Sequence, residues 1–221
     1  MSEHNEINLS ESYDKLDEFL NKNKQPLGIA GIVLAVLIGG YYYYAYIRMP
    51  AKEKDAQAQI YIGQNYFESD SIGRALNGDG NYLGFLSIID EYSGTKAGNL
   101  ANYYAGISYL KMGNYQDAVK YLEEFSSDDI VVSAIAFGAI GDAYTEMNDW
   151  ENGLKYYQKA MKKNPNEFST PIFMMKTALV LEKQEKFSEA REIYEQIKNK
   201  YPLSPEAKDI DKYIARAEAK M

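Results

Sequence analysis

The second half of the chain repeats itself three times, and this self-similarity limits the possible folds more than any other feature. Residues 101–125, 134–165 and 171–202 align with small and large residues in register. Small residues let two antiparallel helices cross closely, and large ones fill the space between neighbouring hairpins. The pattern therefore predicts stacked helical hairpins. Its registered positions are Gly106, Tyr109, Tyr115 and Ala118 in the first copy, Gly141, Tyr144, Trp150 and Gly153 in the second, and Ala178, Leu181, Phe187 and Ala190 in the third.

These residues resemble the tetratricopeptide repeat. The first copy departs from the family by carrying Phe125 where a small residue is usual. The resemblance implies an all-α fold, a right-handed solenoid of helical hairpins, with repeats at 99–132, 134–167 and 171–204. The second copy is the most faithful and has, at the family's spacing, Gly141, Tyr144, Trp150, Ala160 and Pro165.

A weaker unit at 56–95 precedes the repeats, so that the repeat domain spans 51–204. Gly63, Tyr66 and Ala75 fit the pattern, and the insertion RALNGDGNYLG at 74–84 displaces the second helix to about residues 85–92. No strand precedes the NGDGN segment, which lacks the lysine of a phosphate loop and the ligands of an EF-hand. We interpret it as a turn.

A last helix at 205–221 follows the repeats and is expected to cap the solenoid. Ser204 or Pro205 would begin it. Its apolar residues share one face, as capping requires: Ile210, Tyr213, Ile214 and Ala217.

An uncharged run of residues, 27–47, lies near the N terminus and ends in a tyrosine cluster. As a helix rising 1.5 Å per residue it would be about 31 Å long, which matches a bilayer hydrocarbon core. The tyrosines would form an interfacial belt, with Arg48 just beyond it. A cleaved signal peptide is the alternative, but the run is long for one and no A-x-A-like site follows. The belt residues are Tyr41, Tyr42, Tyr43, Tyr44 and Tyr46.

Three small residues, Gly31, Ala35 and Gly39, fall on one face of this expected transmembrane helix. Their spacing permits close packing with a second helix, and hence a homodimer, although glycine is common in membrane helices. The tail at 1–26 contains a short amphipathic helix capped by Asn8 or Ser10, which we interpret as skirting the membrane rather than as a docking site. Its apolar side comprises Leu9, Tyr13, Leu16 and Leu20.

Composition excludes several classes of function. The 221-residue chain has no cysteine, so thiolate metal sites, disulfides and cysteine nucleophiles are impossible. Its single histidine, His4, lies in a polar tail, and no metal or cofactor is expected. The net charge of -8 with no basic run argues against nucleic-acid binding. Neighbouring carboxylates such as Glu123 and Glu124 point apart on a helix, so we predict no catalysis.

The tetratricopeptide resemblance also implies a concave protein-binding groove lined by the first helix of each pair. The lysine and asparagine clamp of some family members is missing, because Tyr103 and Ile107 occupy two of its places. An apolar groove with an acidic middle would suit extended or hydrophobic protein segments, unless the last helix fills it. The expected groove positions are Phe67, Tyr103, Ile107, Leu110, Asp142, Thr145, Glu146, Met175, Leu179 and Glu182.

The order of helical tail, single span and repeat domain resembles the bacterial ancillary subunit of the Sec translocon, a family anchored in the inner membrane. That resemblance implies a cytoplasmic N terminus, periplasmic repeats, and a chaperone-like role toward exported or envelope proteins and the translocon. Charge alone does not choose the orientation, because three basic residues lie close to each end of the span. A cytosol-facing docking receptor and a self-associating structural protein are the alternatives.

Overall fold

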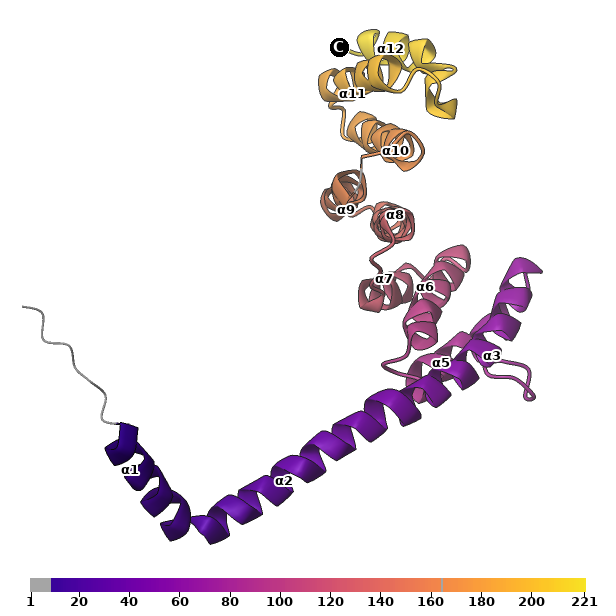
Figure 1. Ribbon diagram of the computed structural model, residues 1–221. Helices are drawn as coiled ribbons and strands as arrows, with labels where there is room; N and C mark the ends of the chain where they lie inside the picture. Colours follow the sequence, from indigo (N-terminus) through magenta and orange to yellow (C-terminus); the bar gives the residue numbers. More distant parts are fainter. Residues whose placement is uncertain (1–8, 164) are drawn as a thin grey trace, which may run out of the picture. The chain divides into compact units, whose positions relative to one another are not determined.

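The computed structural model of the protein describes residues 9–163 and 165–221, and the regular structure of these residues is entirely helical (Figure 1). The chain divides into two compact units, Met1–Lys52 and Glu53–Met221. The first unit contains the tail and the apolar run, whereas the second contains the repeats.

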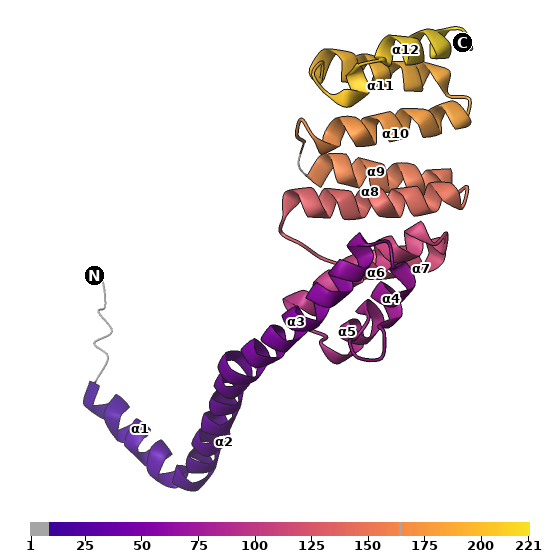
Figure 2. The same ribbon diagram turned by 90° about the vertical axis from the view of Figure 1, so that its right-hand side faces the viewer.

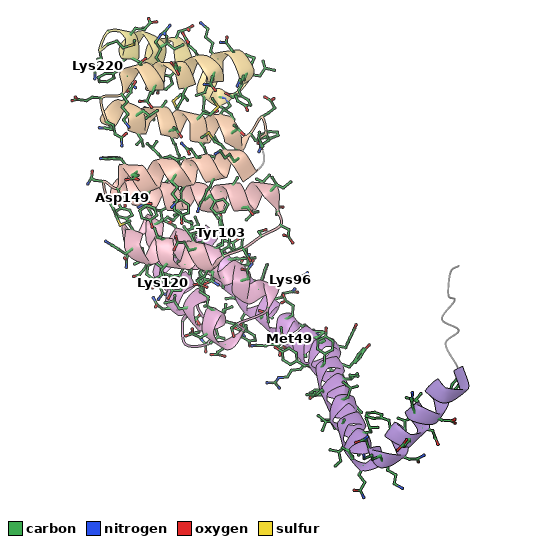
Figure 3. All side chains as sticks on the ribbon, turned by 90° about the vertical axis from the view of Figure 1, so that its left-hand side faces the viewer. Met49, Lys96, Tyr103, Lys120, Asp149 and Lys220 are labelled. Atoms are coloured by element: carbon green, nitrogen blue, oxygen red, sulfur yellow. The ribbon has the colours of Figure 1, made fainter. Side chains whose placement is uncertain are left out.

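The first unit consists of exposed helices. Helix α1 covers Leu9–Lys22, α2 covers Lys24–Tyr43, and a π-helical turn covers Tyr44–Arg48. No residue of α2 is buried, and its side chains project on every side (Figure 3). The helical stretch Lys24–Glu68 is long and apolar enough to cross a membrane, with a mean hydropathy of 1.7 over its most apolar window.

The π-helical turn differs from the uniform α-helix expected over 27–47. Such turns occur mainly as single-turn insertions within α-helices. Here the turn starts inside the tyrosine cluster, where the rings of Tyr42 and Tyr46 stack with centroids 5.4 Å apart. The geometry of neighbouring aromatic rings is a tertiary detail that hydropathy does not reveal.

The second unit is a stack of helical hairpins (Figure 2). Three hairpins correspond to the three sequence repeats, and each packs against the next. Their helices are α6 (Lys96–Lys111) with α7 (Tyr115–Glu124), α8 (Ile130–Glu146) with α9 (Trp150–Lys163), and α10 (Ser169–Lys183) with α11 (Phe187–Lys200). The helices α3 (Met49–Glu68), α4 (Ile72–Asn77) and α5 (Phe85–Glu91) precede them.

The small residues of the repeat lie at helix crossings that leave no space for a larger side chain. A Cβ added at Gly106 would lie 2.5 Å from Leu122, and one at Gly141 would lie 2.5 Å from the Tyr157 ring. Ala178, at the equivalent position of the third repeat, is fully buried. The packing cause inferred from the sequence is therefore present in the structure.

The same tight turn ends the first helix of every hairpin. In the three clear repeats the backbone adopts a left-handed conformation at Gly113, Asn148 and Glu185, with φ of 76°, 61° and 60°. The next residue's N–H then donates to the carbonyl oxygen five residues before it, as in the 2.9 Å bond from Lys186 to Leu181.

The weak unit has this turn as well. Asp70 has a φ of 56°, and the N–H of Ser71 donates to the oxygen of Tyr66 at 2.8 Å. A Cβ at Gly63 would lie 2.7 Å from the ring of Phe85, which begins α5, so Gly63 meets the displaced helix as Gly106 meets Leu122. The first residues of the expected insertion, 74–77, belong to α4 instead. The turn and the crossing place this unit in register with the others.

The chain ends in two helical pieces. A 3-10 turn, Pro205–Ala207, is capped by the Ser204 side chain, and α12 follows at Ile210–Glu218. Ile210 and Ala217 are buried against α10 and α11 in one core cluster, with Tyr213 and Ile214 packed beside them. The expected apolar face of the last helix thus covers the end of the stack.

Candidate protein-binding groove

A cavity of about 740 Å³ is lined by residues of all three clear repeats. Its volume lies within the range of ligand pockets in proteins. The cavity draws on helices α6, α7, α8, α9 and α10 and on the turn before α9. It is lined by Leu110, Tyr115, Asp142, Thr145, Glu146, Asn148, Trp150, Tyr157, Lys176, Leu179, Val180 and Lys183.

Half of the ten expected groove positions line this cavity. They come from the first helix of each of the three clear repeats, and Leu179 and Glu146 are exposed there. The structure thus brings together Leu110, Asp142, Thr145, Glu146 and Leu179.

Four other expected positions pack against cores instead of lining the cavity. Phe67 contacts the Tyr104 ring edge-on at 5.3 Å, and the Lys111 ammonium lies 4.9 Å from its centroid. Tyr103 and Ile107 pack against the core of α7 and α8, and Met175 packs against the core of α10 to α12. These four side chains are half-buried by those contacts.

The tenth position, Glu182, is held by the C-terminal helix. Arg216 of α12 donates to both carboxylate oxygens of Glu182, at 3.3 and 2.7 Å, and the Tyr194 hydroxyl donates at 3.2 Å. None of the residues lining the 740 Å³ cavity belongs to α12. The last helix covers Glu182 but does not fill this cavity.

The middle of the cavity contains a neutralised acid rather than a free one. Lys176 of α10 donates to both oxygens of Asp142 at 2.6 Å, and the Tyr157 hydroxyl donates to one of them at 2.8 Å. Burial raises the pKa of Tyr157, and the Asp142 carboxylate raises it further. Asp142 and Lys176 thus form an ion pair across two repeats, which neutralises the expected acidic middle at Asp142, whereas Glu146 is an exposed acid in the same cavity.

Several residues that line the cavity were not predicted from the sequence. Trp150 was interpreted only as packing between helices, yet it also borders the cavity. Tyr115, which occupies the same repeat position as Trp150, does so as well. Their recurrence at one position was the available signal. Lys176 gave no such signal, because its pairing with Asp142 of the preceding hairpin depends on how the repeats stack.

The expected membrane-facing residues are all exposed in the first unit. The belt tyrosines are between 52 and 70% exposed. A Cβ added at Gly31 or Gly39 would meet nothing within 4 Å, and Ala35 is exposed. Packing through this face stays a prediction that requires a second helix.

Metal chemistry finds no support in the described part of the chain. Within residues 9–163 and 165–221 no group of three or more His, Cys, Asp or Glu residues could hold a metal ion. His4 and Asn8 lie outside the described residues, and Ser10 lies within α1.

Comparison with known families agrees with the hairpin stack. Tetratricopeptide repeat models match residues 103–168 and 173–204. A search of curated proteins found no match. The matches support a tetratricopeptide repeat protein, and such repeats generally bind other proteins.

Proposed function

We propose that the chain is a membrane-tethered, non-enzymatic scaffold that binds extended polypeptide segments in its groove. The observation that carries the proposal is the cavity shared by three adjacent repeats, in which the exposed Leu179 and the half-buried Leu110 and Trp150 lie in the same lining as a neutralised ion pair. Repeat solenoids bind partners through such surfaces.

The chemistry of the cavity suits a peptide chain. Leu110, Leu179 and Trp150 offer apolar contacts, whereas the ends of the Asp142–Lys176 pair offer an acceptor and a donor. An extended peptide presents apolar side chains together with backbone N–H and C=O groups that need such partners. Because Lys176 neutralises Asp142, the centre does not select strongly for basic ligands.

The tether is supported by the apolar run of the first unit. None of the residues in its most apolar window is buried within the protein. Eighteen or more uncharged residues exposed in this way favour lipid as their surroundings. Resemblance to the translocon's ancillary subunit favours a cytoplasmic tail, periplasmic repeats, and a role in envelope protein export or assembly. Digestion of the repeats by protease added to intact spheroplasts tests that orientation.

Peptide binding can be measured through Trp150, the chain's single tryptophan. The full-length protein in detergent is titrated with a reduced and alkylated, permanently unfolded model protein while Trp150 emission is recorded. We expect saturable emission changes. Leu179→Glu should weaken binding about tenfold, a loss of about 1.4 kcal/mol.

Ile172→Glu is the matched control, because Ile172 lies on the same helix and is 40% exposed, against 38% for Leu179, but does not line the cavity. The groove proposal would be contradicted by equal affinities of the two variants, or by the absence of any saturable change.

Self-association is a second candidate function, favoured by the open face at Gly31, Ala35 and Gly39. Sedimentation of the detergent-solubilised protein as a monomer would remove this candidate without affecting the groove.

A further inference from the structure

The short helix α1 presents an apolar face that no described part of the protein covers. Tyr13, Leu16, Phe19 and Leu20 are 66, 52, 56 and 46% exposed, and none belongs to a core cluster. At 3.6 residues per turn these four side chains fall within an arc of about 120°. The remaining positions of Tyr13–Lys22 are polar.

A short amphipathic helix such as α1 needs a surface that covers its apolar face. With 14 residues, α1 is short for a helix that is stable alone in water, where isolated helices below about 12–15 residues are marginal. Leaving four large apolar side chains in water forgoes the burial that normally stabilises an amphipathic helix.

The chain next to α1 indicates which surface is within reach. Helix α1 ends at Lys22, α2 begins at Lys24, and the uncharged run begins at Leu27. Asn23 makes the bend, with its backbone N–H and its side-chain amide both donating to the Phe19 carbonyl oxygen, at 3.0 and 2.8 Å (Figure 1). Four residues, 23–26, span at most about 14 Å even when extended, so the C-terminal end of α1 stays at the head-group region of a membrane that contains α2.

We infer that α1 is an interfacial helix, lying in the head-group layer with its apolar face against the acyl chains. The inference rests on the proposed membrane tether and names a second lipid contact for it. Amphipathic helices of this kind bury their apolar side at the boundary between head groups and acyl chains.

The polar side of α1 sets the type of lipid. Asp14, Asp17 and Glu18 oppose only Lys15 and Lys22, so Tyr13–Lys22 carries one more negative than positive charge. Most interfacial helices are rich in Lys and Arg and are attracted to anionic lipid. Helix α1 is held by its apolar contacts and by the covalent link to α2, and it favours zwitterionic head groups over anionic ones.

The test places a tryptophan on each side of the helix in the full-length protein. In a Trp150→Phe background, Leu16→Trp reports the apolar side and Glu18→Trp the polar side. Both proteins are reconstituted in phosphatidylcholine nanodiscs, with and without acyl-chain bromination. We expect blue-shifted emission and quenching by brominated lipid for Leu16→Trp, and emission typical of water for Glu18→Trp. Replacing part of the lipid with phosphatidylglycerol should reduce the quenching.

Other outcomes overturn the inference. Water-like emission from both tryptophans would show that α1 lies off the membrane. Blue-shifted Leu16→Trp emission without quenching would show that protein covers the face instead. Increased quenching in anionic lipid would contradict the charge argument. Failure of the protein to co-elute with the discs would instead refute the tether, which separates the two proposals.

Discussion

The two units of the chain use glycine and tyrosine in opposite ways. In the repeats, Gly106 leaves no room for a Cβ and Tyr194 is completely buried. In the first unit, Gly39 has open space around it and Tyr46 is 70% exposed. The same residue types therefore fit two different surroundings, a packed protein interior and, in our proposal, a lipid bilayer. Stability of the repeats should depend on their own packing, whereas the first unit should depend on lipid.

The largest expected difference between the units concerns large apolar side chains. Phe85 is completely buried, stacks on Tyr104 and fits against Gly63, so Phe85→Ala should lower the free energy of unfolding of the repeats by about 3–5 kcal/mol. Leu37→Ala, at a position 64% exposed, should leave it unchanged. Urea titration of the full-length protein in detergent, followed by helical circular dichroism, measures both. Equal losses would contradict the division into units.

The second contrast between the units concerns the space around their glycine residues. Gly106→Ala should destabilise the repeats by about 1–3 kcal/mol through overpacking against Leu122, less the better helix propensity of alanine. Gly39→Ala adds its methyl to open space and should not change the unfolding of the repeats. The same titration applies, and a stabilising Gly106→Ala would show that Leu122 moves aside freely.

A smaller effect is expected from the buried tyrosine at the C-terminal end of the stack. Burial raises the pKa of Tyr194, and the Glu182 carboxylate adds to the increase. Because the folded pKa lies above the unfolded value of about 10, this stabilisation is complete below pH 10 and is lost as the pH rises toward the folded pKa.

Tyr194→Phe tests that dependence. At neutral pH the free energy of unfolding of the variant should be lower by about 1 kcal/mol, because the hydrogen bond to Glu182 is gone. Above pH 10 this free energy should fall less steeply with pH in the variant than in the unchanged protein. Thermal unfolding at several alkaline pH values measures the slope, with Tyr46→Phe as the control in the first unit. Identical slopes for Tyr194→Phe and the unchanged protein would refute the assignment of this pH dependence to Tyr194.

The smallest expected effect is a gain in stability at the turn of the third clear repeat. Glu185 takes the left-handed conformation that Gly113 occupies in the first repeat, and a side chain makes this conformation costly. Glu185→Gly should stabilise the protein by about 0.5–1 kcal/mol, whereas Glu189→Gly, within α11, should destabilise it by a similar amount. The midpoint temperatures of thermal unfolding of the two variants and the unchanged protein test this expectation. A loss of stability in Glu185→Gly would show that the Glu185 side chain makes a stabilising contact.

Much of the fold was predictable because local packing repeats along the chain. Gly63, Gly106 and Gly141 marked the helix crossings. The ion pair of Asp142 with Lys176 was not predictable, since it joins residues of two hairpins whose relative position depends on stacking. For the same reason the packing of Tyr103 and Met175 against core clusters could not be predicted, and their place in the groove stays a prediction. The π-helical turn at Tyr44–Arg48 lay beyond any hydropathy pattern.

The central claim is that the two units are stabilised by different surroundings, and a urea wash of reconstituted vesicles tests it most directly. Concentrated urea should unfold the repeats, which then become sensitive to added protease, while the chain still floats with the vesicles and a fragment containing residues 27–47 stays protected in the bilayer. Release of the whole chain from the vesicles by urea would contradict the account.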